Sequence, residues 1–250
     1  MNFLLSIVFY NLLFFIGRGF AISVSKLLGI KLKENIFGVF HENLFVIYTL
    51  FLIGNLSFLL NFFIPINQLI VLIPISIFLI FNFNNPLKLN KKNYFILSNI
   101  CIPFILTFST FDIGFHYDAA LYHLNFQNWL LNEKIVFGLS NVYAPFGLSS
   151  ISDYILSNFH VNGNFVALHF LNIAIFTSLF SLLFSIIFFD KKSSYKFAGL
   201  FVLLFCFFDN FGINGGGNGF PNFQGIGKVD NLFGVLFLFI VLMYINMKKE

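Results

Sequence analysis

Chemically reactive side chains are scarce in this chain of 250 residues, since only 10% of the residues are charged. Two stretches, at about residues 111–164 and 209–230, combine acidic side chains with histidine or lysine between apolar stretches. The first contains carboxylates and histidines together with Trp129, the single tryptophan, and the second contains Lys228 and Asp230. A carboxylate can take a proton from a hydroxyl group, and a lysine can hold a phosphate. These two stretches are therefore where we expect any chemistry to occur.

Asp118 is the first candidate, in the string His116-Tyr-Asp-Ala-Ala-Leu-Tyr-His-Leu124. In one interpretation it is the N-cap of a helix from about Ala119 to Asn132, where its side chain would satisfy free backbone N–H groups. In the other it is a general base at the membrane edge, which deprotonates an acceptor hydroxyl during group transfer from a lipid-linked donor. The two roles are compatible, so both stay open.

Asp112 ends an apolar stretch, where a carboxylate is either simply hydrated or takes part in substrate binding. His116 and His123 flank Asp118, but the separation of two between His116 and Asp118 matches no recognised metal-ligand spacing. We therefore predict no dedicated metal site, and a need for a divalent metal as cofactor stays open. His123 and Trp129 are retained as candidate substrate-binding residues.

Lys228 and Asp230 lie just before the last apolar stretch. The positive-inside trend disfavours a lysine on the exterior side, which makes phosphate binding a reasonable role for Lys228. Asp230 either caps the final helix or takes part in catalysis. His169 lies inside an apolar stretch, where an ionisable side chain is either functional or held by an interhelical hydrogen bond. Arg18, near the end of the first apolar stretch, is expected to extend toward the lipid headgroups.

The elements that carry these residues are membrane spans, because the chain is too apolar for one water-soluble core. Hydrophobic residues make up 58% of the sequence, and the mean hydropathy is +0.89. The formal net charge is +4, but the basic residues occur in short clusters between apolar stretches. This arrangement is typical of topology signals and not of nucleic-acid binding. Cys101 and Cys206 lie in apolar stretches, so neither a disulfide framework nor a zinc motif is indicated.

About seven stretches approach the roughly 20 residues that a helix needs to cross the hydrocarbon core. Pro65 and Pro74 are expected to kink or split the second and third of them. The predicted fold class is all-α, a polytopic transmembrane helix bundle that forms a single membrane domain over residues 1–250. The stretches lie at about residues 3–22, 43–63, 66–83, 94–110, 165–189, 196–208 and 231–247.

Four clusters of basic residues fall on the same side of this topology, and Lys and Arg mark the cytoplasmic side. We therefore expect a bacterial inner-membrane protein with its N-terminus outside and its C-terminus in the cytoplasm. Residues 111–164 and 209–230 then face the exterior. The clusters are Lys26, Lys31 and Lys33, then Lys88, Lys91 and Lys92, then Lys191, Lys192 and Lys196, and finally Lys248 and Lys249.

The first exterior stretch is long enough to hold helices of its own. The predicted helix from Ala119 to Asn132 places Tyr122, Phe126 and Trp129 on one face at i, i+4 and i+7 spacing. We expect it to lie along the membrane surface with these aromatic side chains at the interface. A second short helix is expected at about residues 149–158.

The motifs of this stretch run Asp118-Ala-Ala-Leu-Tyr-His-Leu, then Trp129, then Ile135-Val-Phe-Gly-Leu-Ser-Asn141, then Gly147-Leu-Ser-Ser150. They resemble uncharacterised multi-pass bacterial proteins related to the GT-C glycosyltransferase superfamily. The resemblance covers about residues 110–160. A weaker similarity is Lys228-Val-Asp230, ahead of a late apolar stretch.

The resemblance implies a bundle of membrane helices whose first long exterior loop carries an essential acidic residue and folds into interfacial helices. Such enzymes pass a sugar from a polyprenyl-phosphate carrier to an acceptor on the exterior face of the membrane. Matched to this sequence, Asp118 is the loop aspartate, His123 its frequent neighbour and Asp230 the later acid. GT-C enzymes usually have more spans than are predicted here, so the chain could be part of a larger protein.

Two other functions stay open. A transporter or flippase would also have many spans, and prolines that break its helices. A non-catalytic membrane protein would need none of the acidic residues. The acidic residues gather at the exterior interface and not in mid-membrane, which favours the glycosyltransferase. The expected partners are membrane lipid and a polyprenyl-phosphate sugar, with no nucleic acid.

Overall fold

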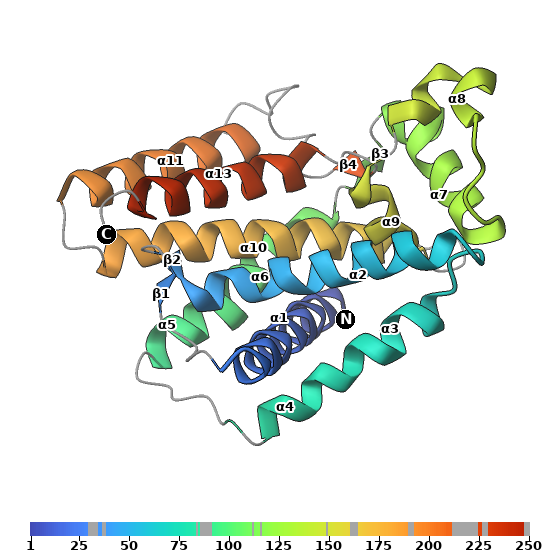
Figure 1. The fold of residues 1–250 in the computed structure, drawn as a ribbon. Coiled ribbons are helices and arrows are strands. Elements are labelled where there is room, and N and C mark those ends of the chain that lie inside the picture. Colours follow the sequence, from blue (N-terminus) through green and yellow to red (C-terminus); the bar gives the residue numbers. More distant parts are fainter. Residues whose placement is uncertain are drawn as a thin grey trace.

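Long apolar sequences without an early proline form the main helices of this protein, as shown by a computed structural model (Figure 1). The structure describes residues 1–29, 35–36, 39–83, 85, 92–111, 113–115, 117–148, 150–160, 165–189, 193–211, 225–226 and 230–247. Four helices are long and apolar enough to cross a membrane. This agrees with the predicted membrane protein. The four are α1 (Asn2–Leu27), Glu42–Asn61, which includes α2 (Phe45–Asn61), Lys92–Phe111 and α10 (Val166–Phe189).

Helices also form at the other three predicted positions, but the apolar parts that the structure describes there are shorter. Pro65 lies in the connection between α2 and α3, and Pro74 lies inside α3, which continues through a 3₁₀ turn into α4. The prediction that prolines interrupt this region is therefore confirmed. These helices are α3 (Gln68–Ser76), the 3₁₀ turn Ile77–Leu79, α4 (Ile80–Phe83), α11 (Ser193–Phe211) and α13 (Asp230–Met247).

The span Lys92–Phe111 is not a regular α-helix. It consists of α5 (Lys92–Ile96), a π-helical segment (Leu97–Cys101), α6 (Ile102–Leu106) and a 3₁₀ segment (Thr107–Phe111). Two pairs of short strands add to the helices. β1 (Asn35–Ile36) and β2 (Val39–Phe40) pair antiparallel, and β3 (Gly114–Phe115) and β4 (Gly225–Ile226) pair parallel.

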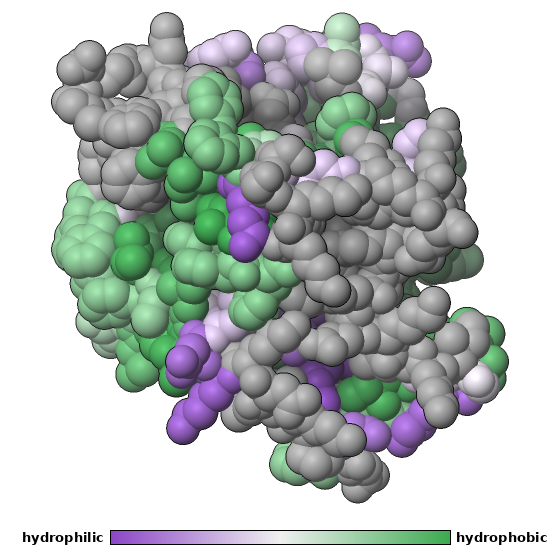
Figure 2. Space-filling model, turned by 90° about the vertical axis from the view of Figure 1, so that its left-hand side faces the viewer, coloured by the Kyte–Doolittle hydropathy of each residue, from purple (hydrophilic) through white to green (hydrophobic). Residues whose placement is uncertain are grey.

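The helices run back and forth between the two ends of one bundle (Figure 1). At one end α1 and α10 finish and α11 begins, which is where the chain continues into the predicted basic clusters. At the other end α2 finishes, α10 and α13 begin, and the short helices α7 (Leu124–Asn132), α8 (Leu139–Val142) and α9 (Ile151–Ser157) lie (Figure 1). Figure 2 looks onto the first end and shows an apolar area beside small, separate groups of hydrophilic residues.

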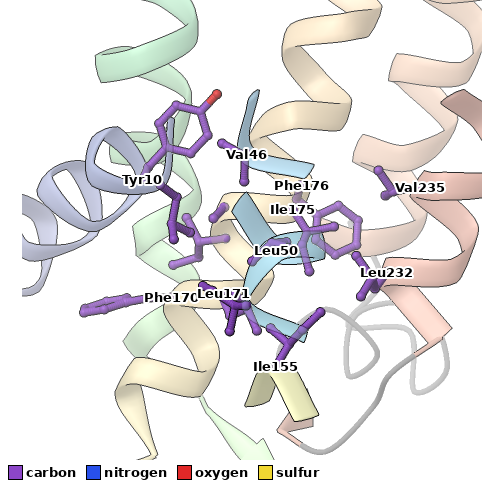
Figure 3. Packing of buried hydrophobic residues seen from close by; sticks show 14 of the residues in the cluster. Tyr10, Val46, Leu50, Ile155, Phe170, Leu171, Ile175, Phe176, Leu232 and Val235 are labelled. Atoms are coloured by element: carbon purple, nitrogen blue, oxygen red, sulfur yellow. The ribbon is translucent and has the colours of Figure 1, made fainter. Parts of the chain in front are cut away.

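The core forms around α10, whose sequence is apolar on every side. Side chains from α1, α2 and α13 pack against it, among them Tyr10, Leu50 and Leu232 (Figure 3). Ile155 joins this core from α9 (Ile151–Ser157), a helix of the first exterior stretch that lies between α2 and the start of α10. The predicted exterior residues are thereby packed directly onto the membrane bundle.

Glycines let α1 lie unusually close to two neighbouring elements. A Cβ atom at Gly17 would lie 1.7 Å from the carbonyl oxygen of Phe45 in α2. One at Gly19 would lie 1.8 Å from the carbonyl oxygen of Phe78 in the 3₁₀ turn. Small residues at such contacts are the usual means by which membrane helices approach one another. Only glycine fits at these two positions.

Polar side chains join α1 to the span Lys92–Phe111. Ser6 and Thr107 share a hydrogen bond between their hydroxyl groups, and Asn11 Nδ2 donates to the carbonyl oxygen of Asn99 at 2.8 Å. Asn99 Nδ2 donates in return to Asn11 Oδ1 at 3.1 Å. Interhelical hydrogen bonds of this kind hold helices together where no hydrophobic force acts between them.

Arg18, the basic residue near the end of the first apolar stretch, is buried against protein groups. Nη1 donates to Asn82 Oδ1 and Nη2 donates to the carbonyl oxygen of Asn85, both at 2.7 Å. The guanidinium group therefore ties α1 to the end of α4, because a planar fork of donors can serve two acceptors at once.

Candidate functional site

A small lobe, formed by residues 117–148 and 150–160, lies at the end of the bundle where α2 finishes and α10 begins (Figure 1). The helix predicted from Ala119 to Asn132 is present as a π-helical segment (Ala119–His123) followed by α7 (Leu124–Asn132). The second predicted helix is present as α9 (Ile151–Ser157). Between them lie α8 (Leu139–Val142) and a 3₁₀ turn (Ala144–Leu148).

Local sequence explains where the lobe helices begin. Gly138 has φ +85°, a left-handed conformation that glycine adopts at little cost, and α8 starts directly after it. At α9 the side chain of Ser150 and that of Asp153, three residues on, form a capping box. Each side chain satisfies a backbone N–H that the first helical turn leaves free.

Hydrogen bonds fix the lobe to the bundle. The end of α7 contacts the chain that follows α2, since Ile66 N–H donates to the carbonyl oxygen of Leu130 at 2.8 Å. Side chains of the bundle and the lobe add three further bonds. These are Asn61 Nδ2 to the carbonyl oxygen of Glu133 at 3.0 Å, Asn158 Nδ2 to Ser57 Oγ at 2.8 Å, and Gln68 Nε2 to the carbonyl oxygen of His160 at 2.6 Å.

A cavity of about 200 Å³ opens in this lobe. Glu133 and Lys134 contribute a carboxylate and an ammonium group to its lining, and both residues are exposed. Trp129, which is 38% exposed, presents its indole ring here. Because the cavity combines aromatic faces with one charge of each sign, it can hold a small polar ring and contact an attached anionic group. Its other aromatic residues are Phe126, Phe137, Phe146 and Tyr154.

A buried polar cluster lies on the same two helices. Asp153 is 0% exposed, and its Oδ1 accepts from His123 Nδ1 at 2.9 Å and from Gln127 Nε2 at 3.3 Å. Its Oδ2 accepts from the backbone N–H of Ser150 at 3.1 Å. The negative charge of Asp153 raises the pKa of Tyr154 in addition to the larger effect of burial. Asp153 therefore joins α7 to α9 and influences a residue of the cavity.

The expected capping role of Asp118 is wrong. Its backbone already has helical angles, φ −65° and ψ −24°, and its side chain makes no capping hydrogen bond. The helical conformation begins one residue earlier, at Tyr117. An N-cap residue needs an extended backbone so that its side chain can reach back to free N–H groups. Asp118 instead lies half-buried immediately before the π-helical segment, a distortion frequent at functional sites.

The other predicted residues fall in different places. His123 belongs to the buried cluster, and Trp129 lines the cavity. Asp230 is the first residue of α13, with its side chain outside the described residues, and Asp112 and Lys228 lie outside them altogether. The pairing of β3 with β4 nevertheless joins the two exterior stretches, since Gly114 lies opposite Gly225 and Phe115 opposite Ile226.

Sequence reasoning missed several residues of the lobe. It named His123 as a candidate but did not identify its partner Asp153, or Gln127, which donates to the same carboxylate. The Ser150-x-x-Asp153 spacing at the start of a short helix is a capping-box pattern and could have indicated where the carboxylate points. Nothing in the local sequence marks Glu133 and Lys134, which line the cavity only because the chain turns after α7.

His169 has the structural role that was considered for it, a hydrogen bond between helices. Its Nε2 lies 2.8 Å from Ser109 Oγ, an interhelical hydrogen bond within the bundle. In the part of the chain that the structure describes, no three His, Cys, Asp or Glu side chains lie close enough together to hold a metal ion.

The site is thus defined by its own geometry, as an aromatic cavity with two charged residues beside a buried histidine and aspartate. Comparison with protein-family models, with curated proteins and with solved structures finds no match for this chain.

Proposed function

We propose that this protein is a GT-C-like membrane glycosyltransferase, which passes a sugar from a polyprenyl-phosphate-linked donor to an acceptor at the exterior face of the membrane. The observation that carries the proposal is the cavity with Trp129, Glu133 and Lys134. It lies in a lobe at one end of an apolar bundle (Figure 1). A lipid-linked sugar needs a polar cavity next to lipid, and a cavity at one end of an apolar bundle fits this need.

The size of the cavity suits one sugar ring. Sites for drug-sized ligands measure roughly 300–1,000 Å³. A cavity of about 200 Å³ is smaller and takes one ring with its substituents. The indole of Trp129 offers an apolar face for the ring, while Lys134 supplies a cation for the phosphate of the donor.

The acidic residues that the resemblance assigns keep their roles within this proposal. Asp118 and Asp230 are the candidate catalytic residues, with Lys228 and Asp112 as candidate contacts of the donor. The β3–β4 pairing supports a shared site, because it brings the segment before Asp118 next to the segment before Asp230. No metal is needed for the proposal, and a divalent ion that bridges the acids to the phosphate is compatible with it.

The proposed membrane arrangement has seven spans, with α3–α4, α11 and α13 added to the four long apolar helices. The basic clusters would lie in the cytoplasm of a bacterial cell and the lobe outside its inner membrane. In this arrangement the helices of the lobe lie at the membrane interface, where the carrier lipid presents its phosphate.

Transport is the alternative that a specific observation favours. The segments Gln68–Phe83 and Lys92–Phe111 are interrupted by 3₁₀ or π-helical turns, and broken helices are a feature of transporters. However, the polar contacts described between α1 and the second of these segments are mutual hydrogen bonds between protein groups. Such a closed pair offers no ready contact to a substrate.

The test uses Trp129 as a built-in reporter, because it is the only tryptophan. Purified protein is titrated with a decaprenyl-phosphate-linked hexose and, separately, with decaprenyl phosphate. We expect the sugar-linked lipid to change the tryptophan emission and the lipid alone to change it much less. In proteoliposomes with the labelled donor, Trp129→Ala should lower sugar transfer at least tenfold. Phe63→Ala is the matched control, because Phe63 is 80% exposed and does not line the cavity.

Each result decides between the functions. Sugar transfer that depends on Trp129 supports the glycosyltransferase. Counterflow of the labelled lipid across the bilayer without transfer to any acceptor would replace it with a flippase. Unchanged emission and no transfer across a panel of lipid-linked hexoses would overturn the proposal.

A further inference from the structure

The buried cluster of the lobe has the form of an oriented base. His123 is 5% exposed, and its Nδ1 lies 2.9 Å from Asp153 Oδ1. A carboxylate can only accept here, so Nδ1 carries the proton and the neutral ring has its lone pair on Nε2. The described hydrogen bond of the ring is the one from Nδ1 to Asp153, which leaves Nε2 as the nitrogen that can take a proton. A histidine held by an aspartate in this manner is ready to accept a proton at Nε2.

The surroundings keep Asp153 available for this role. Its carboxylate also accepts from Gln127 Nε2 and from the backbone N–H of Ser150, at 3.3 and 3.1 Å. With these donors around it, the carboxylate is held as an acceptor that orients Nδ1–H of His123. The pair is therefore built to fix one tautomer of the histidine and to stabilise the imidazolium that forms when Nε2 is protonated.

The same helices connect the pair to the cavity. His123 lies three residues before Phe126, about one helical turn along the chain, and Phe126 lines the cavity. On α9, Asp153 directly precedes Tyr154, another lining residue. The ring of Tyr154 packs at 6.3 Å from that of Phe126. The pair thus lies at the α7–α9 contact, about one helical turn from residues that line the cavity, and His123 is not itself one of the lining residues.

A second observation also points to a ligand. Gln127 is 0% exposed, and its Oε1 has no hydrogen-bond partner within the described structure. It lies one turn after His123 on the same helix face. Buried polar atoms are almost always satisfied, so an unpartnered one next to an oriented base calls for a polar group from outside the protein.

We propose that the pair of His123 and Asp153 is the proton acceptor of the transfer reaction. This inference rests on the proposed glycosyltransferase function and assigns the base to His123 in place of Asp118. The acceptor hydroxyl gives its proton to Nε2 while its oxygen bonds to the anomeric carbon. The bond from that carbon to the phosphate oxygen breaks, and the polyprenyl phosphate leaves with the electron pair. The imidazolium then returns its proton to water.

The titratable side chains near the ring of His123 come from its own helical segment and from α9. On its own segment the ring centre of Tyr122 lies 4.3 Å from that of His123, and on α9 Asp153 contacts Nδ1 and is followed by Tyr154. Burial raises the pKa of Tyr154, so this phenol stays neutral near pH 7. The test therefore compares pH profiles and not activities at one pH.

The key variant is His123→Asn, whose side-chain NH₂ can replace Nδ1–H and keep the bond to Asp153 while the base is lost. With a decaprenyl-phosphate-linked hexose as donor, we expect kcat to fall about a hundredfold or more with little change in KM. The rise of kcat/KM with pH that reports a neutral histidine should disappear. Full transfer by a folded His123→Asn protein, or an unchanged pH profile, would overturn the assignment.

Chemical modification separates this inference from the proposed function, because it needs no transfer. Diethyl pyrocarbonate acylates a free, unprotonated imidazole nitrogen, and mass spectrometry locates the modified residue. We expect His123 to react in the wild-type protein, and to react more slowly in Asp153→Asn, where the tautomer is no longer fixed. If the wild type transfers no sugar but His123 is modified in this way, only the proposed sugar transfer is refuted, and the oriented base stands. A His123 that stays unmodified in the folded protein refutes the oriented base itself.

Discussion

Removal of the Asp153 carboxylate should loosen the lobe more than any other single change within it. Asp153→Ala leaves two buried donors, His123 Nδ1–H and Gln127 Nε2–H, without their acceptor. A buried donor that loses its partner costs about 1–3 kcal/mol, and loss of a helix cap costs about 1 kcal/mol more. We therefore expect the opening free energy of α7 and α9 to fall by about 3–5 kcal/mol, the range typical of breaking a buried polar pair.

Hydrogen exchange measured by mass spectrometry in detergent micelles reports this locally. A loss of about 3–5 kcal/mol speeds amide exchange in α7 and α9 by two to three orders of magnitude or more, while α10 should exchange as before. Ser152→Ala is the matched control, because Ser152 is buried beside Asp153 but its Oγ has no hydrogen-bond partner within the described residues. That change should leave exchange unaltered or slower. Equal exchange in wild type and Asp153→Ala would refute the view of this carboxylate as the link between the helices.

Three further predictions concern the bundle and its junction with the lobe. Gly17→Ala should prevent accumulation of folded protein in the membrane, because its Cβ would collide with the backbone of Phe45. Gly234→Ala is the control and should be neutral or slightly stabilising, because a Cβ there meets nothing within 4 Å. The yield of membrane protein and a thermal melt in detergent test both variants. Arg18→Lys should lower the melting temperature, because a single ammonium group cannot reproduce both hydrogen bonds, to Asn82 Oδ1 and to the carbonyl oxygen of Asn85. An unchanged melting temperature would contradict this. Burial lowers the pKa of His160, so the folded protein favours the neutral ring. The folded protein should therefore be most stable above about pH 6.5 and lose stability as the pH falls toward the lower pKa of the folded state. Thermal melts of the wild type and His160→Asn at pH 7.5 and 5.5 would detect this loss, which only the wild type should show.

The membrane helices could be predicted from the sequence because length and apolarity decide them locally. Each of the seven predicted stretches contains a helix, and Pro65 and Pro74 mark where the second and third are interrupted. Packing was not accessible in the same way. Arg18 was expected at the headgroups because no local pattern shows that Asn82, more than sixty residues later, supplies its acceptor.

The lobe shows the same division between local and distant information. Helices at both expected places follow from local patterns, and His123 could be named as a candidate from its place beside Asp118. Its partner Asp153 lies thirty residues away, and only folding brings it there. The helical conformation begins at Tyr117, two residues before the predicted start at Ala119, which is why the predicted cap at Asp118 is wrong. Such a shift depends on packing and leaves no clear mark in the sequence.

The places of buried polar atoms that lack a hydrogen-bond partner also favour chemistry at the lobe over transport through the bundle. Of the buried side-chain atoms that lack a hydrogen-bond partner among the described residues, four belong to the lobe: Gln127 Oε1, Ser152 Oγ, Asn158 Oδ1 and His160 Nε2. Asn61 Oδ1 at the end of α2 and Ser181 Oγ in α10 belong to the bundle. Burial without a partner costs free energy, so such groups persist where a ligand or water satisfies them during function. A transporter would concentrate them halfway along its membrane helices. Because more of them belong to the lobe that contains the cavity of Trp129, they favour a protein that meets its substrate at that end of the bundle.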